Sequence, residues 1–152
     1  MRELGLPGVV FTPTAFIGGT SDFDADTSEP VAAVCDWDEL RELEAGALSV
    51  QSHGVSHRAF SDLGITEIES ELARSRKALE QGLGRAVELF SFPYGDVGAD
   101  EQATSDALAR TGYRAAFLYG GGPAKLPTAA PYRLERLAMW PDTDLVAELG
   151  AY

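Results

Sequence analysis

The amino-acid sequence predicts an α/β domain built on a parallel sheet, either open or curved into a barrel. Short apolar runs typical of buried strands alternate along the chain with amphipathic helical segments. Glycine and proline stand at the ends of these segments, where chains turn. Because such alternation favours right-handed crossovers between parallel strands, we expect functional side chains to gather where the strands end. The length of 152 residues suits a single domain, 1–152.

Local patterns predict the first strand and the first helix. A β-branched and aromatic run opens the range 9–17 and predicts a buried strand that continues loosely to the end of that range. The range 20–30 carries alternating acids, but it lacks the central glycine and the final glutamate of a calcium loop, which favours a solvated loop. Asp36 and Glu39 form a capping box, so we expect a helix that ends at Gly46.

The middle of the chain predicts two more strands around its longest helix. Residues 48–52 read as a strand, and residues 88–92 as the next one. Between them, Thr66 and Glu69 match a second capping box, which places the start of the helix. Gly84 marks its end, because glycine adopts the left-handed conformation that closes many helices.

The last third predicts two strands and two helices. A third helix is expected over residues 99–111, ended by Gly112. A strand is expected over residues 113–119 and a last strand over residues 132–139. A closing helix is expected over residues 142–149.

Composition and charge exclude several classes of function. The formal net charge is −12, so the field of the protein repels phosphate and predicts no nucleic-acid partner. No segment approaches the roughly 18 consecutive apolar residues of a membrane span, which predicts no membrane partner. Cys35 is the single cysteine, so no internal disulfide forms, and we expect it to be a small buried apolar residue.

The beginning of the chain lacks the apolar core of a signal peptide. Residues 2–5 read instead like the tail of a helix stopped by glycine, which suggests that an upstream segment is absent. If Met1 is the true start, we expect a cytoplasmic protein. If an upstream segment exists, the compartment stays open.

The two histidines of the chain, His53 and His57, lie four residues apart directly after the predicted strand 48–52. Imidazole nitrogens are frequent ligands of zinc and related ions. This spacing lets both bind one ion if a carboxylate or water completes the shell. Isolated histidine pairs also pack in cores or lie at surfaces. The position at a strand end, and the turn 92–95 at the next strand end, favour the metal site.

These motifs resemble those of the polysaccharide deacetylases, the NodB-homology family. Residues 52–57, SHGVSH, resemble the H-S/T-x-x-H type of metal motif in that family, and residues 92–95, FPYG, resemble its P-Y-G turn. Shorter similarities lie at residues 4–8, 37–40 and 111–114. The resemblance covers about residues 2–117.

The resemblance implies a distorted parallel (β/α) barrel of the polysaccharide deacetylase type, incomplete at the N-terminus. In such a domain a divalent ion, with zinc expected, activates water to remove N-acetyl groups from amino-sugar polysaccharides. His53 and His57 would be the metal ligands. Tyr94 would be catalytic through its backbone N–H, which helps to hold the oxyanion. Pro93 and the ring of Tyr94 would bind the carbohydrate substrate.

The sequence also departs from the family pattern. The first strand of the family ends in a paired-aspartate motif, T-F-D-D-G, which supplies the catalytic base and a third metal ligand, and this chain has no Asp-Asp pair. A late histidine that often serves as general acid is absent as well, and Arg136 and Met139 near that position do not match it. Two protein ligands hold zinc poorly. We therefore expect weak metal binding and slow or absent turnover.

A substitute carboxylate is an open alternative for the missing aspartates. The candidates lie in loops expected to leave the sheet near the histidines. They are Asp22, Asp24, Asp26, Asp36 and Asp96.

Two other classes of function compete with the hydrolase. One is a catalytically inactive remnant that binds carbohydrate or a partner domain through the same face. The other is a structural role in which His53 and His57 only pack or cap. A missing first strand would leave a sheet edge exposed, so we also expect self-association into a homo-oligomer that covers it.

Overall fold

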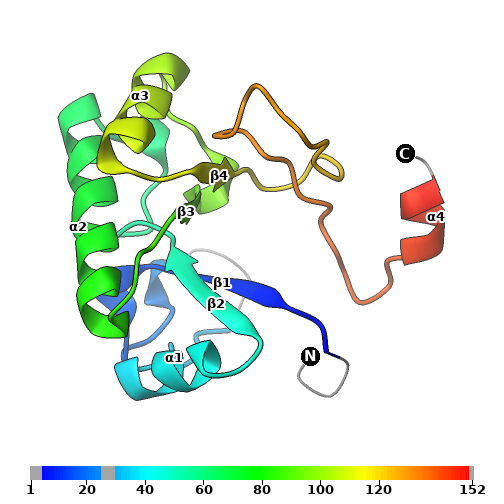
Figure 1. The fold of residues 1–152 in the computed structure, drawn as a ribbon, viewed down its shortest axis with the longest axis horizontal. Coiled ribbons are helices and arrows are strands. Elements are labelled where there is room, and N and C mark those ends of the chain that lie inside the picture. Colours follow the sequence, from blue (N-terminus) through cyan, green and yellow to red (C-terminus); the bar gives the residue numbers. More distant parts are fainter. Residues whose placement is uncertain (1–4, 25–29, 151–152) are drawn as a thin grey trace.

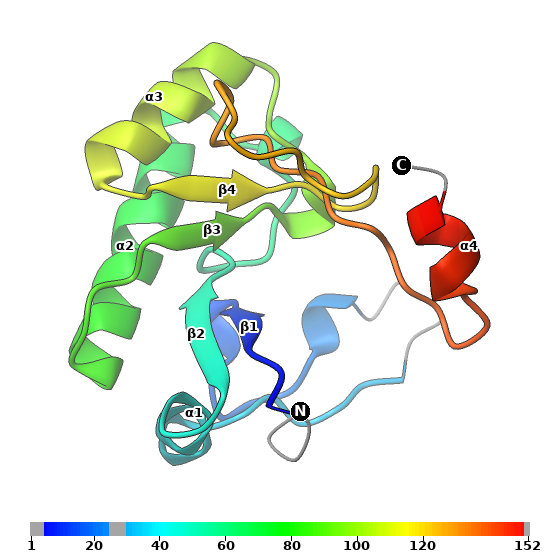
Figure 2. The same cartoon turned by 45° about the vertical axis from the view of Figure 1, so that its right-hand side comes forward.

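The computed structural model describes residues 5–24 and 30–150 of the chain. Four strands form one parallel sheet in the order β1-β2-β3-β4, as Figure 2 shows. They are β1 (Gly8–Thr12), β2 (Leu48–Ser52), β3 (Leu89–Ser91) and β4 (Ala115–Phe117). Sequential strands are neighbours throughout, so all of their carboxyl ends meet at one edge. The predicted α/β class with a parallel sheet is confirmed.

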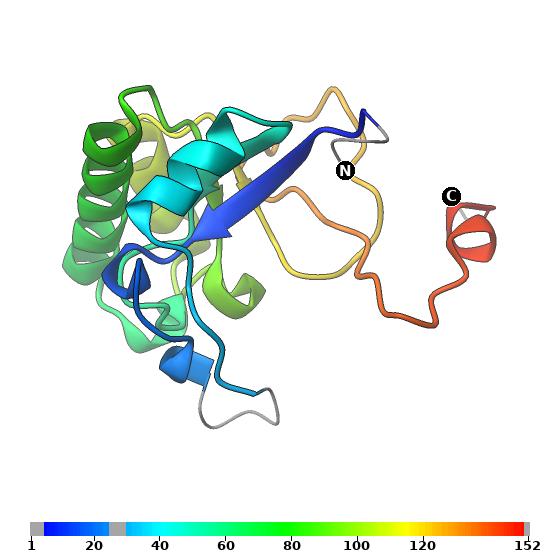
Figure 3. The same cartoon turned by 90° about the horizontal axis from the view of Figure 1, so that it is seen from below.

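Three helices make the crossovers between the strands. They are α1 (Trp37–Glu44), α2 (Ile65–Leu83) and α3 (Glu101–Thr111). The longest, α2, packs beside α3, and both cover the same side of the sheet (Figure 1). The short helix α4 (Leu145–Gly150) lies apart from the sheet, at the far end of the C-terminal segment (Figure 3).

The boundaries of α1 and α3 agree with the sequence. The Asp36 carboxylate accepts the Glu39 N–H at 2.9 Å, and the Glu39 carboxylate accepts the Asp36 N–H at 2.9 Å, which is the predicted capping box. Gly112 closes α3 with a φ of 92°, a conformation that glycine adopts at little cost.

The predicted capping box of α2 is wrong. The helix begins at Ile65, before Thr66, and Glu69 makes no capping contact there. Instead, the Glu67 carboxylate accepts the N–H of Gly64, the residue that precedes the helix, at 3.0 Å. Glu67 therefore takes the capping role that was expected of Glu69.

Two predicted strand segments also differ from the structure. The range 9–17 does not stay extended, because Thr14–Phe16 forms a 3₁₀ turn whose first N–H bonds to the carbonyl of Gly54 at 3.0 Å. The range 132–139 is no strand, and pairs with β4 through a single parallel bridge between Phe117 and Leu134.

The core lies between the sheet and the helices α2 and α3. Phe90 of β3 packs against the rings of Phe60, Phe92 and Tyr113, with ring centroids 5.3 to 5.6 Å apart. These rings are almost fully buried, and such contacts contribute beyond the area they bury. The cluster therefore fixes β3 and the turn that follows it.

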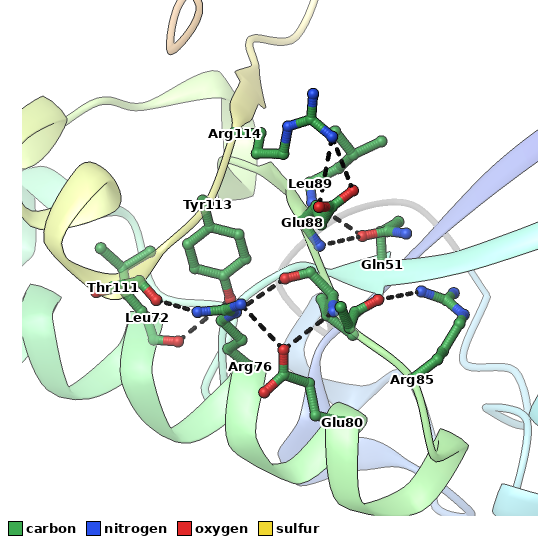
Figure 4. A network of polar contacts seen from close by, with 12 residues as sticks. Gln51, Leu72, Arg76, Glu80, Arg85, Glu88, Leu89, Thr111, Tyr113 and Arg114 are labelled. Carbon is green, nitrogen blue, oxygen red and sulfur yellow. Dashed lines mark hydrogen bonds and ion pairs between the residues drawn. The ribbon is translucent and has the colours of Figure 1, made fainter.

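A polar network holds the opposite end of β3 (Figure 4). Only Ser52 and Phe90 pair between β2 and β3. The side chain of Gln51 extends this pairing, because its carbonyl oxygen accepts the N–H of Glu88 at 3.1 Å and of Leu89 at 2.9 Å. The side chain of Arg76 in α2 donates to the carbonyl of Val87, the residue before Glu88, at 2.9 Å. The network thus sets the register of the two strands, of which β2 leads to the histidines and β3 leads to the turn that carries Tyr94.

Two further expectations can be compared with the structure. Cys35 is half-buried and packs against the core. Among the described residues, no helix combines the length and the apolar character that crossing a membrane requires.

Candidate metal centre

The predicted site residues come together at the carboxyl ends of β2 and β3. His53 follows β2 directly, and Tyr94 lies in the 3₁₀ turn Pro93–Gly95 that follows β3. The ring centroids of His53 and His57 are 4.8 Å apart, and those of His57 and Tyr94 are 4.9 Å apart. Pro93 is buried, while Tyr94 is exposed.

His53 is held in one tautomer by the backbone of β3. Its Nδ1 lies 2.6 Å from the carbonyl oxygen of Ser91. A carbonyl only accepts, so Nδ1 carries the proton and Nε2 keeps its lone pair. The pKa of His53 is lowered to about 4, mainly by burial; the Ser91 carbonyl opposes this shift, and the nearby His57 and Arg136 add to it. The imidazole is therefore neutral at pH 7.

His57 is connected to an acid through Tyr94. Its ring is 9% exposed. Its Nδ1 lies 3.2 Å from the Tyr94 hydroxyl, which donates to the Asp24 carboxylate at 3.3 Å. The same nitrogen is 3.8 Å from Asp24 itself. Burial lowers the pKa of His57, and the charge of Asp24 opposes that shift. Asp24 is thus one of the substitute acids, and it does lie beside the histidines.

The other candidate acids have different partners. Asp36 caps α1. Asp22 accepts from the Thr20 hydroxyl at 2.8 Å. Asp96 accepts from the backbone of Ser61 and Gly98, so it braces the loops beside α2. Asp26 lies outside the described residues.

The backbone is unusual at two positions of the site. His57 and Tyr94 both have a φ of 57°, and among the described residues they are the two non-glycine residues with positive φ. Each such position costs about 1 to 3 kcal/mol and persists only where surrounding contacts hold it. Such outliers cluster at functional sites.

Glu71 of α2 supplies one of the contacts that hold the histidine loop. Its carboxylate accepts the N–H of Val55 at 2.7 Å and of Ser56 at 3.0 Å. Bonds from a charged group to the backbone are among the stronger hydrogen bonds. Sequence analysis missed Glu71, because nothing in a helical glutamate shows that it faces a loop.

A cavity of about 360 Å³ opens beside His53. Arg136, which matched no family motif, enters it from the C-terminal segment. The residues that line this cavity are Val9, Phe11, His53, Ser91, Phe92, Tyr94, Tyr119 and Arg136. A larger cavity of about 550 Å³ lies beside α1, but it holds no histidine. The smaller cavity is therefore the one that belongs to the site.

The donor set matches two positions of a divalent metal. His53 and His57 are both neutral near pH 7 and lie side by side, as imidazole ligands must. Across residues 5–24 and 30–150, no three His, Cys, Asp or Glu side chains are grouped closely enough to hold an ion. The described chain thus offers two of the three protein ligands usual for catalytic zinc.

The sequence and the fold resemble those of known proteins. A family model described as polysaccharide deacetylase matches residues 1–116. A search of curated proteins finds no match. The fold is similar to that of Streptococcus pyogenes deacetylase PplD, with a TM-score of 0.75, 18% identity, and coverage of 93% of this chain and 56% of that chain.

Two further solved structures are similar. IcaB from Ammonifex degensii matches with a TM-score of 0.72 and 21% identity over 93% of this chain and 60% of that chain. A de-N-acetylase from Aggregatibacter actinomycetemcomitans matches with a TM-score of 0.70 and 16% identity over 95% of this chain and 64% of that chain. The chain thus spans less than two thirds of each of these proteins.

At such identities the structural likeness shows the fold, and it confirms an α/β domain of the deacetylase type. The family model covers most of the sequence, including the histidine loop and the turn at Tyr94. The chain belongs to the polysaccharide deacetylase family.

Proposed function

We propose that the chain is a metal-dependent hydrolase domain that removes N-acetyl groups from amino-sugar polysaccharides, with an incomplete active site. His53 and His57 bind a divalent ion, for which zinc is the expected choice. The observation that carries this proposal is the bond from His53 Nδ1 to the Ser91 carbonyl. A backbone carbonyl on one nitrogen, which leaves the other free as a ligand, is typical of metal-binding histidines.

The metal would supply Lewis acidity toward the acetyl carbonyl and lower the pKa of a water molecule. The chain supplies position and charge. Ser91 orients His53, and the loop held by Glu71 presents His57. Tyr94 is the proposed catalytic residue, with its backbone N–H as oxyanion donor. Its exposed ring lines the sugar site, and the buried Pro93 belongs to the turn that presents this ring.

Asp24 acts in this proposal as a positioning residue. Through the Tyr94 hydroxyl and its own charge, it favours a proton on the Nδ1 side of His57. That leaves Nε2 of His57 as the ligand atom, in the same tautomer as His53. The incomplete ligand set predicts weak metal binding, because across the described residues no three His, Cys, Asp or Glu side chains are grouped so that they could hold one ion.

A second candidate function is a catalytically inactive domain that binds carbohydrate or a partner. The observation that favours it is a pair of exposed rings beside the cavity. Tyr94 is 53% exposed and Tyr119 is 59% exposed. Tyrosine offers an apolar face and a polar tip, as a sugar-binding surface requires. In this case chitooligosaccharide binds, but no acetate is released.

The two functions are separated by acetate release from chitooligosaccharide in the presence of zinc. The hydrolase releases acetate, and the His53→Ala, His57→Ala double variant does not. Asp24→Asn lowers the rate, whereas Asp96→Asn serves as a matched control because Asp96 contacts a different loop. Binding without release by the wild type would favour the second function.

We further propose that the chain self-associates through β1. This strand forms an edge of the sheet, with β2 on one side only. Val9 in its middle is 44% exposed, and open strand edges pair readily with other chains. Light scattering at increasing concentration checks this, and a strictly monomeric mass would contradict it.

A further inference from the structure

The outer edge of β1 exposes the backbone groups of two residues. The Gly8 N–H donates to the carbonyl of the residue before β2 at 3.0 Å, and the Thr12 carbonyl accepts the N–H of the residue after β2 at 3.1 Å. Gly8, Val10 and Thr12 therefore direct their backbone groups toward β2, because this direction alternates along a strand. Val9 and Phe11 direct theirs away from β2, where no strand or loop of the described residues bonds to them.

The sequence around this edge lacks the usual protection of an edge strand. Charged side chains and prolines commonly keep open strands from pairing with other chains, and β1 contains neither. Residues 5–21 form the longest stretch of the chain without a charged side chain. Because each copy carries a net charge of −12, two copies repel each other least when they approach along this stretch. The charge pattern thus favours a second copy at the edge of β1.

The open groups of β1 are complementary to those of a second β1. A two-fold dimer presents the same edge from both copies, so the two strands run antiparallel. With the two-fold axis at Val10, Val9 of each copy lies opposite Phe11 of the other, and each such pair exchanges two N–H···O=C bonds. Every open group is then paired. Moving the axis by one residue in either direction places a carbonyl opposite Pro7 or Pro13, which have no N–H.

This pairing also adds a wall to the cavity beside the histidines. The side chains of Val9 and Phe11 lie on one face of the sheet and both line the 360 Å³ cavity. Residues that lie opposite each other in an antiparallel pair have neighbouring side chains. The Phe11 ring of the second copy therefore lies beside Val9, which is 44% exposed in the single chain. Each copy contributes an apolar side chain to the site of the other.

We propose that two copies pair β1 with β1, antiparallel, about a two-fold axis at Val10, and that each copy thereby supplies part of the wall of the other copy's cavity. This inference rests on the self-association proposed above, and it names the backbone groups that form the interface. It depends neither on a metal ion nor on hydrolysis.

Val9→Pro tests the pairing, because it removes an N–H that points away from β2 and leaves the bonds within the sheet in place. In analytical ultracentrifugation of the full chain, we expect a dimer for the wild type and a dissociation constant raised roughly tenfold or more for Val9→Pro. Added salt should strengthen the wild-type dimer, because it screens the repulsion between two acidic copies. Val31→Pro is the matched control, since Val31 is also exposed and lies outside the strands; it should dimerise as the wild type does.

Disulfide trapping tests the position of the axis. The two Val10 residues form a non-hydrogen-bonded pair, whose Cα atoms are about 4.5 Å apart in antiparallel sheets, and a disulfide spans that distance. In a Cys35→Ser background, Val10→Cys should give a covalent dimer that a reducing agent separates. Ser70→Cys, on the exposed side of α2, should stay monomeric on a denaturing gel.

The outcomes separate the proposals from one another. A strictly monomeric wild type would overturn both the self-association and its geometry. A dimer that Val9→Pro leaves unchanged would place the association at another surface and overturn the pairing of β1. Dissociation by Val9→Pro without trapping by Val10→Cys would show that β1 is the interface but that the axis is not at Val10. If Val9→Pro does not fold, as judged by circular dichroism, the trapping result decides. None of these results involves acetate release, so a failure of the hydrolase would be recognised separately.

Discussion

Replacing Gln51 by leucine tests whether a side chain, rather than backbone pairing, sets the register of β2 and β3. The substitution removes the acceptor of two backbone N–H groups, at 3.1 and 2.9 Å, from a residue that is 5% exposed. Each lost hydrogen bond costs about 1 kcal/mol, and more if the donor stays buried without a partner. We expect the free energy of unfolding to fall by about 2 to 4 kcal/mol.

Urea unfolding measures this effect. With a slope near 2 kcal/mol per molar urea, the midpoint should fall by about 1 to 2 M. Gln102→Leu is the matched control, because Gln102 is exposed on α3 and bonds only to Asp106 one turn away. We expect that variant to stay within about 0.5 kcal/mol of the wild type. Equal midpoints for both variants would refute the role of Gln51.

Three further predictions concern the turn, the core and the loop. Gly95→Ala places a Cβ 2.6 Å from the Tyr119 backbone nitrogen at a φ of 74°, so it should destabilise the protein by about 2 to 4 kcal/mol in thermal unfolding. The control Gly84→Ala, with a φ of 71° and open space around the added Cβ, should cost about 1 kcal/mol. Equal costs would contradict the steric argument. Burial raises the pKa of Tyr113 to about 12, so the folded state keeps a proton that the unfolded chain loses above pH 10. Between pH 9 and 11 the free energy of unfolding of the wild type should fall by about 1.4 kcal/mol more than that of Tyr113→Phe. Parallel pH profiles of the two proteins would contradict this. Glu71→Gln weakens the acceptor of two backbone N–H groups in the histidine loop. It should reduce zinc affinity severalfold in calorimetry with little change in helix content. Unchanged affinity would mean that the histidine loop keeps its conformation without Glu71.

Local rules were sufficient for the parts of the fold that depend on neighbours in sequence. The alternation of strands and helices predicted the parallel sheet, and the pair Asp36 and Glu39 predicted the start of α1. The same rule failed at α2, where the capping glutamate is Glu67, two residues before the predicted Glu69. Residues 132–139 have the composition of a strand, but their pairing depends on the length of β4.

The candidate site could be predicted only in part for the same reason. The spacing of His53 and His57 identified the pair, because both lie in one loop. Asp24, Glu71 and Arg136 reach the site from three other segments, and no local pattern distinguishes them from ordinary charged residues. Asp24 was one of five candidate acids, and only the course of the loop after β1 separates it from the others.

Zinc titration by calorimetry tests the central claim most directly. The wild type, freed of metal by chelation, should bind about one zinc ion per chain with modest affinity, because two imidazoles supply the protein ligands. The double variant His53→Ala, His57→Ala should show no binding, while Asp96→Asn should bind as the wild type does. Zinc binding that survives in the double variant, or no binding by the folded wild type, would contradict the metal centre proposed at the ends of β2 and β3.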